Sequence, residues 1–227
     1  MSIDSLNTQP HLDVIRAGLL AAMLERTAFE GWTSGVLAAA AKAASIDPGA
    51  VDLACPRGEL DILAYWSAKL DEAMLAAMEA ADMPAMRIRE RVTFAVQARL
   101  EAIGEHNREA ASRAAARLGR PDALLMGKQL IWQSADTIWR ALGDTSTDYN
   151  YYTKRTILSA VLGATIMVWF EGDEERTKRF LGRRIENVMQ FERFKGKVRK
   201  AVARWPDPVA ALARLRYGRG KARPRRM

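Results

Sequence analysis

Residues 31–56 read GWTSGVLAAAAKAASIDPGAVDLACP, and this stretch predicts two short helices joined by a tight turn. The alanine-rich run over 34–44 favours a first helix, because alanine has the highest helix propensity. Ser45-Ile46-Asp47 supplies the turn, and a second short helix is predicted over 48–54. A longer amphipathic helix is predicted ahead of them, over 11–29. The N-terminal part of the chain is therefore expected to be a small three-helix unit.

Helical patterns continue along the rest of the chain, and strand signals are scarce. No segment alternates apolar and polar residues in the manner of a half-buried strand, and Ala, Leu, Arg, Met and Glu dominate. We expect an all-α protein of about nine to ten helices. The predicted helices after the first three cover 58–81, 84–103, 107–118, 121–142, 148–171, 173–204 and 207–217.

The order of these patterns predicts four segments. They are a helix-turn-helix-like subdomain at 11–65, a helical bundle at 66–192, a basic amphipathic helical segment at 193–217 and a disordered tail at 218–227.

The positive charge of the chain is concentrated in its last part. The 227 residues carry 35 Lys and Arg against 27 Asp and Glu, a net charge of +8. Residues 193–227 hold 13 of the basic residues and one acid, so residues 1–192 hold 22 basic and 26 acidic residues. An acidic body with a basic C-terminal segment argues against an evenly basic domain that coats nucleic acid.

Several function classes lack the residues they need. The single cysteine, Cys55, excludes an internal disulfide and a cysteine-based zinc site. The chain has only two histidines, which lie far apart in the sequence, so a His-based metal site or catalytic triad is not expected. We therefore expect no enzyme, catalytic residue, metal or cofactor: the Glu-x-x-His pairs of di-iron bundles are missing, and no cofactor-binding loop is present. The most apolar run, residues 157–170, is shorter than a membrane span. With no leader pattern at the N-terminus, the expected location is a bacterial cytoplasm, peripherally associated with the inner membrane.

The segment 191–205 forms an amphipathic pattern with basic residues opposite and beside apolar ones. Such a helix is typical of attachment to an anionic membrane surface. The predicted membrane-binding residues are Phe191, Phe194, Lys197, Val198, Lys200, Val202 and Trp205. Two alternatives stay open, namely that the helix packs its apolar side on the body, or that the arginine-rich residues 214–226 bind nucleic acid without sequence preference.

Residues 15–65 resemble the TetR-type transcription regulators, with an amphipathic first helix, a Gly-Trp-Thr turn and a degenerate helix-turn-helix. The slot of the recognition helix, residues 48–56, contains no Lys, Arg, Asn, Gln, Ser, Thr or Tyr. Base readout needs donors and acceptors that reach the groove, and Asp52 would be repelled by phosphate. We therefore expect a TetR-like fold that does not bind sequence-specific nucleic acid.

Residues 143–155 read GDTSTDYNYYTKR, with three tyrosines at a predicted helix start. Tyrosine and arginine are enriched at interface hot spots, although the same residues could cap a helix and pack inward. This segment resembles the lipid-binding accessory proteins of ubiquinone (coenzyme Q) biosynthesis, the family known as coenzyme Q protein nine. Its pattern Gly-Asp-x-Ser-Thr-Asp-aromatic-Asn-aromatic-Tyr-Thr-(Lys/Arg)-Arg is matched position by position, and residues 177–187 and Gly31-Trp32-Thr33 also fit.

The resemblance implies a homodimeric TetR-like protein that has lost DNA binding. It implies an apolar cavity for an isoprenoid quinone precursor or phospholipid, a C-terminal helix that touches the membrane, and docking of a ubiquinone-pathway hydroxylase. By motif match the partner-binding surface is Asp148, Tyr151, Tyr152, Lys154 and Arg155.

The apolar and methionine-rich helices supply candidates for the cavity, because methionine adapts to a flexible ligand. The candidates are Met74, Met78, Trp132, Ile138, Leu158, Leu162 and Ile166, which could equally form an ordinary core. The predicted function is a non-catalytic accessory protein that presents a lipid from the membrane to a ring hydroxylase. The alternative is a TetR-type regulator with a hydrophobic ligand.

Overall fold

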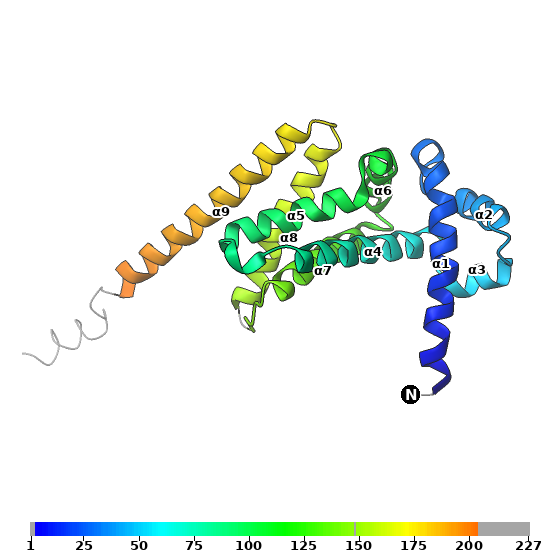
Figure 1. The fold of residues 1–227 in the computed structure, drawn as a ribbon, viewed down its shortest axis with the longest axis horizontal. Coiled ribbons are helices and arrows are strands. Elements are labelled where there is room, and N and C mark those ends of the chain that lie inside the picture. Colours follow the sequence, from blue (N-terminus) through cyan, green and yellow to red (C-terminus); the bar gives the residue numbers. More distant parts are fainter. Residues whose placement is uncertain (1–2, 148, 204–227) are drawn as a thin grey trace, which may run out of the picture. The chain divides into compact units, whose positions relative to one another are not determined.

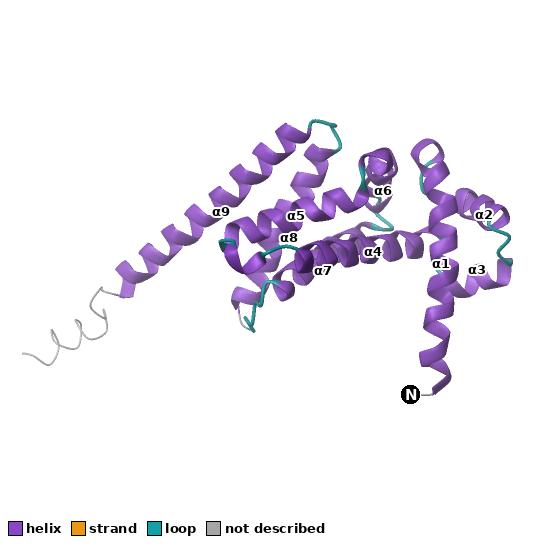
Figure 2. Ribbon diagram, viewed as in Figure 1, coloured by secondary structure: helices purple, strands orange, loops and turns teal. Residues whose placement is uncertain are grey.

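The fold is all-α, as predicted. A computed structural model describes residues 3–147 and 149–203, with side chains for 11–147 and 149–188, and nine α-helices and no strand lie in these ranges (Figures 1 and 2). The helices are α1 (Ile3–Glu30), α2 (Ser34–Ala43), α3 (Pro48–Ala54), α4 (Glu59–Ala80), α5 (Ile88–Ile103), α6 (Arg108–Leu118), α7 (Leu124–Ala141), α8 (Tyr149–Trp169) and α9 (Glu174–Ala203). Two single-turn 3-10 helices, η1 (Met83–Ala85) and η2 (Glu105–Asn107), precede α5 and α6.

The chain divides into two compact units at Ile185/Glu186. The second unit is described only as the last part of α9, up to Ala203. The helix predicted over 207–217 and the tail predicted at 218–227 lie outside the described residues, and the boundaries predicted at 65 and 192 remain predictions.

The three N-terminal helices form the expected small unit around α1, which crosses the start of α4 (Figure 1). Thr33 caps α2 by accepting a hydrogen bond from the Val36 amide at 3.2 Å. Asp47 caps α3 by accepting from the Gly49 and Ala50 amides at 2.8 and 3.3 Å. These two caps explain why short helices end and restart where the sequence predicts.

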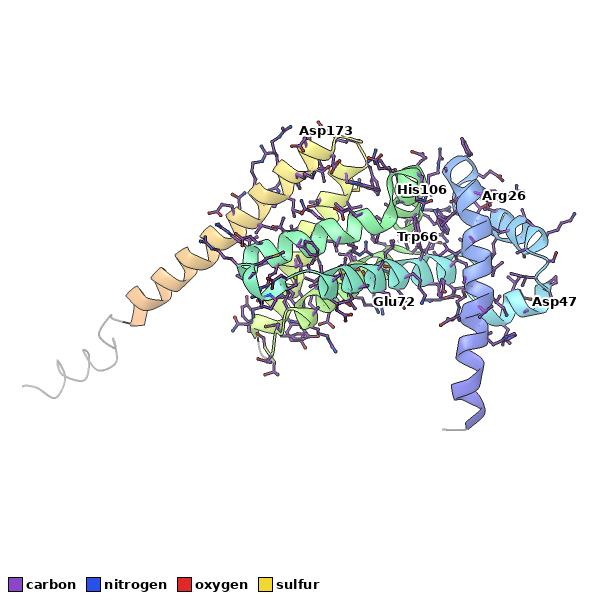
Figure 3. The ribbon with its side chains drawn as sticks, viewed as in Figure 1. Arg26, Asp47, Trp66, Glu72, His106 and Asp173 are labelled. Atoms are coloured by element: carbon purple, nitrogen blue, oxygen red, sulfur yellow. The ribbon has the colours of Figure 1, made fainter. Side chains whose placement is uncertain are left out.

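A pair of tryptophans joins this unit to the rest of the body. Trp32 stacks on Trp66 of α4 with ring centroids 5.4 Å apart, and its indole nitrogen donates to the Ala110 carbonyl of α6 at 2.9 Å. In Figure 3, Trp66 lies in the interior, whereas Asp47 lies at the surface beside α3. One core therefore runs from α1 through α4 to α6.

Helices α4 to α8 form a bundle, in which α4 packs on α5 and α7, and α7 packs along α8. Gly163 of α8 allows this approach, because a β-carbon there would lie only 3.2 Å from the Ile131 side chain of α7. Among the described residues, no helix is both long and apolar enough to span a bilayer.

Three predicted helix starts are wrong. α1 begins at Ile3 and not at 11, because the helix continues through Pro10 with the loss of one backbone donor. α5 begins at Ile88 and not at 84, because the Glu90 carboxylate accepts from the Arg87 amide at 2.8 Å and starts the helix there. α7 begins at Leu124 and not at 121, because Arg120 to Ala123 form a turn closed by an amide-to-carbonyl bond of 3.0 Å.

Candidate functional site

A cavity of about 330 Å³ lies inside the bundle. Apolar side chains from five helices, α4 to α8, make up most of its wall, including Trp66 (Figure 3). Its lining residues are Leu63, Trp66, Ser67, Leu70, Arg99, Ile103, Ala111, Ala114, Ala115, Leu118, Gly119, Leu124, Gly127, Lys128, Leu130, Ile131, Ile166 and Phe170. A volume of this size is within the range of small-molecule sites.

A buried ion pair provides the polar part of the cavity wall. The Arg99 side chain is 7% exposed, and its Nε donates to Asp71 at 2.7 Å and to Ser134 at 3.1 Å. Its Nη2 donates to the Ser67 hydroxyl at 3.0 Å, and the Ser134 hydroxyl donates to Asp71 at 2.9 Å. The cluster joins α4, α5 and α7, and Arg99 and Ser67 reach the cavity.

The structure brings one of the seven predicted cavity residues, Ile166, to this cavity. Met74, Ile138 and Leu162 are 0% exposed, and Met78 and Leu158 are 4% exposed. They pack in the interior away from the cavity wall. Trp132 is half-buried, and its ring lies 6.4 Å from that of Tyr152. The hydrophobic pattern could mark these residues as interior, but it could not separate cavity wall from core.

The tyrosine segment at the start of α8 is built around Arg155. The Arg155 side chain is 1% exposed; Nε donates to Asp136 of α7 at 2.5 Å, and Nη1 donates to Asp144 at 3.0 Å. Its guanidinium also lies 3.5 Å from the centroid of the Tyr151 ring. Arg155 thus holds the α7–α8 connection from inside and presents no exposed surface to a partner.

The electrostatics of this cluster favour the ionised groups. Burial alone would raise the pKa of Asp144, but hydrogen bonds from Lys154, Ser146 and Arg155 hold this pKa well below its usual range. Burial likewise opposes ionisation of Asp136, and Arg155 and Arg140 lower its pKa. Burial would lower the pKa of Arg155, but Asp136 and Asp144 raise it above the usual range. The cluster is therefore a charged structural network at neutral pH.

The exposed part of the segment is aromatic. Tyr152 is 61% exposed and Tyr149 is 73% exposed, and the Tyr151 and Tyr152 rings meet edge to face with centroids 5.1 Å apart. Tyr151 is half-buried and donates its hydroxyl to Asp136 at 3.2 Å. Lys154 is half-buried and its Nζ lies 2.6 Å from Asp144. Asp148 lies outside the described residues.

The predicted membrane-binding residues cannot be placed on a face. The backbone of α9 continues to Ala203, which agrees with a helix over most of 191–205. The side chains of Phe191, Phe194, Lys197, Val198, Lys200 and Val202, and the whole of Trp205, lie outside the described residues. Their role remains a prediction.

The segment predicted as the slot of a recognition helix forms α3, and the exposed positions of α3 carry no cation. Pro48, Gly49, Asp52 and Leu53 are exposed, and Leu53 is 64% exposed. This surface lacks donors for base edges and positive charge for phosphate. Within the described ranges, no group of three His, Cys, Asp or Glu side chains is placed to hold a metal ion.

Comparison with known proteins points to one family. Residues 126–192, which include most of α7, all of α8 and the tyrosine segment, match the COQ9 family model. The ubiquinone biosynthesis protein COQ9, mitochondrial, of Rattus norvegicus is 27% identical over 186 residues, covering 78% of this chain and 59% of the relative. The protein of the same name from Homo sapiens is 27% identical over 182 residues, covering 76% and 57%.

This chain is therefore similar to the COQ9 proteins, over residues 126–192 in the family model and over about three quarters of its length in the rat and human relatives. The expected involvement in ubiquinone biosynthesis is supported by these relatives, whose names state that process and no catalytic activity. The match to Bos taurus COQ9 is 37% identical over 65 residues, but it covers 27% of this chain and 20% of the relative. The chain spans somewhat less than three fifths of the length of the human relative.

The predicted location in a bacterial cytoplasm is wrong. The COQ9 relatives from rat, human and Drosophila melanogaster are all named as mitochondrial proteins, which conflicts with that location.

Sequence reasoning missed the polar cluster of the cavity. Its hydrogen-bonded pairs are separated by 28 to 63 residues along the chain, so no local sequence motif indicates them. The available signal was an arginine at 99 within the apolar stripe formed by Val92, Val96 and Ile103 of α5. A cation at a core-facing position is rare without a buried partner.

Proposed function

We propose that this chain is a non-catalytic lipid-binding accessory protein of ubiquinone biosynthesis. It binds an isoprenoid quinone precursor or a phospholipid in the cavity between α4 and α8, and presents the ligand from a membrane to a ring hydroxylase. The observation that carries this proposal is the apolar cavity of about 330 Å³ in a chain related to ubiquinone biosynthesis proteins. Burial of apolar surface drives such binding, at about 0.8 kcal/mol for each CH₂ taken from water.

The proposal is tested by identifying what the protein carries. The full chain is purified and extracted with organic solvent, and the extract is analysed by mass spectrometry. We expect an isoprenoid lipid or a phospholipid in stoichiometric amount. Ala114→Phe fills the cavity and should lose this lipid, whereas Ala116→Phe, on the exposed side of the same helix, should retain it. A protein that carries no lipid, or equal lipid in both variants, would contradict the proposal.

The hydroxylase is proposed to dock on the exposed tyrosines of α8. Tyr149 and Tyr152 offer large, partly exposed rings that lose little side-chain entropy on binding. Tyr149→Ala combined with Tyr152→Ala should weaken binding to the hydroxylase by at least tenfold. The exposed Thr156→Ala, one turn further along α8, serves as the control. Unchanged binding by the double variant would place the docking surface elsewhere.

The homodimer and the attachment to an anionic membrane are proposals from the family resemblance and the basic segment at 193–217. Light scattering should give twice the 25.3 kDa of one chain. Phe194→Asp combined with Trp205→Asp should release the protein from vesicles that contain anionic lipid and leave its helical content unchanged. A monomer would refute the first proposal, and unfolding of the variant would refute the second in favour of a helix packed on the body.

The second candidate function, transcription regulation, would require sequence-specific binding to DNA. A regulator binds its operator with an affinity that falls steeply as salt rises. The exposed face of α3 carries Asp52 and no basic residue, so we expect no sequence-specific binding to DNA. Nanomolar, salt-dependent binding to one DNA sequence would favour the regulator.

A further inference from the structure

The cavity has an enclosed end and an open end of different chemistry. Among the lining residues, Trp66, Leu70 and Arg99 are buried, and Arg99 is 6% exposed. Leu124 and Lys128, at the start of α7, line the same cavity and are exposed to solvent. The open end of the cavity therefore lies at the start of α7, and Arg99 belongs to the buried part of its wall.

Arg99 retains hydrogen-bonding capacity in the cavity. A guanidinium has five N–H donors, and no acceptor of its own. Nε and Nη2 of Arg99 donate to Asp71, Ser134 and Ser67, as described above. Nη1 donates to no acceptor among the described residues. Nη1 is not one of the fully buried polar atoms that lack a partner, so it is accessible from the cavity, where an oxygen atom of a ligand could accept a hydrogen bond from it.

The net charge of the Arg99–Asp71 pair determines which kind of ligand oxygen can bind to Arg99. Asp71 already neutralises Arg99, at a distance of 2.7 Å, in a site from which most water is excluded. A second anion would arrive without a counter-charge, and burial of an unpaired charge is strongly unfavourable. A neutral acceptor, such as a quinone carbonyl, a phenol or an ether oxygen, bonds to Nη1 without adding charge. The carboxylate of a fatty acid or the phosphate of a phospholipid does not fit this end.

The volume limits how much of a ligand is enclosed. A cavity of ~150 Å³ binds one benzene molecule. The 330 Å³ available here corresponds to about two groups of that size. One substituted ring with a short branched chain fills it, and a long polyprenyl chain does not fit inside.

We propose that Arg99 is the anchor of a ring-binding site, and that the ligand is a neutral, oxygen-bearing aromatic or quinone ring which enters the cavity ring first, with its chain directed outward past Leu124. This inference rests on the proposed lipid-binding function. It chooses between the two ligand classes named there, and it assigns the orientation of the bound molecule.

The test compares probes that differ in oxygen and in charge. Ubiquinone-1 has a quinone ring and one isoprenoid unit; prenylbenzene has a similar shape without oxygen; and decanoate carries a negative charge. Binding is measured by quenching of tryptophan fluorescence, because Trp66 lines the cavity, and for the non-quenching probes by their displacement of ubiquinone-1. We expect ubiquinone-1 to bind about tenfold more tightly than prenylbenzene, which corresponds to one hydrogen bond, and decanoate to bind more weakly than both.

Two variants distinguish the hydrogen bond to Arg99 from the apolar contribution of the cavity to binding. Arg99→Lys keeps the charge beside Asp71 and removes the planar fork, so the preference for ubiquinone-1 over prenylbenzene should fall to below about threefold. Leu124→Trp narrows the entrance and should weaken both neutral probes together. Thermal unfolding checks that each variant folds, and the comparison of probes on the unaltered protein stands if Arg99→Lys does not.

The outcomes distinguish the inference from the proposed function. Equal binding of ubiquinone-1 and prenylbenzene, or tighter binding of decanoate, would overturn the anchor while the lipid-binding function stands. A preference for ubiquinone-1 that Arg99→Lys leaves intact would also overturn it. If none of the probes binds to the unaltered protein, both the Arg99 anchor and the proposed lipid-binding function are contradicted.

Discussion

Replacement of Arg155 by methionine tests whether this residue is structural or part of a docking surface. Arg155 pairs with Asp136 and Asp144, whose side chains are 19% and 5% exposed. Breaking a buried pair by removal of one partner costs about 3–5 kcal/mol, because the remaining charge is left uncompensated. Asp144 keeps Lys154, and Asp136 keeps Arg140 at 2.6 Å. We therefore expect a loss near the lower limit, about 3 kcal/mol in the free energy of unfolding.

The assay is urea unfolding at pH 7, followed by circular dichroism. In a parallel thermal melt, a loss of about 3 kcal/mol should lower the Tm by roughly 6–12 °C in a protein of this size. Arg140→Met is the control, because Arg140 pairs with the same Asp136 but its side chain is 69% exposed. That variant should lose less than about 1 kcal/mol.

A double variant examines the cause of the loss. Asp144→Asn removes one of the two carboxylates that lose Arg155 as a partner in Arg155→Met, so the two changes together should cost less than their sum by about 0.5–3 kcal/mol. An Arg155→Met protein with unaltered stability and weakened binding to the hydroxylase would refute the structural role and restore Arg155 to the docking surface.

Three further outcomes follow from single residues. The pKa of Asp144 is depressed in the folded state, so its stabilising contribution is complete above the unfolded pKa of about 3.9 and is lost as pH falls through the folded value. Asp144→Asn should therefore reduce the dependence of the free energy of unfolding on pH below about pH 4, and an unchanged pH dependence would contradict this. Asp47→Ala removes the cap of α3 and should cost about 1 kcal/mol in urea unfolding, whereas Asp47→Asn should cost a few tenths at most. Burial raises the pKa of Cys55 to about 11, so its thiol should react with Ellman's reagent at pH 8 far more slowly in the native protein than in urea, and equal rates would show that it is accessible.

The helical class could be predicted from the sequence because it depends on repeating local patterns. The positions of α2, α3 and the turn between them follow from alanine propensity and from side-chain caps within a few residues. The starts of α5 and α7 could not be predicted from their prolines alone. At α5 the Glu90 carboxylate starts the helix four residues after Pro84, and a proline at the first helical turn is only one of several possible starts.

The candidate site was less accessible to sequence reasoning. The segment at 143–155 could be recognised, but burial of Arg155 depends on Asp136 in another helix, and the motif does not show which side of α8 faces α7. The cavity wall combines residues from Leu63 to Phe170, and each of them alone resembles an ordinary core residue. Hydrophobic periodicity predicts which positions are interior, but the space left between the side chains depends on how the five helices pack against one another.

The small volume of the cavity constrains how such a protein could handle a long isoprenoid. With the ring held at Arg99, only one or two short groups are enclosed in 330 Å³, and the remaining chain lies outside the cavity. Exposure of that chain to water would cost about 0.8 kcal/mol for each CH₂, which for a long chain exceeds anything that one hydrogen bond at Nη1 supplies. The chain must therefore stay in an apolar environment while the ring is bound. On this argument the tail lies in the membrane, or against an apolar surface of the protein once the lipid has been extracted, and attachment to the membrane would lower the free-energy cost of the step in which the ring leaves the bilayer.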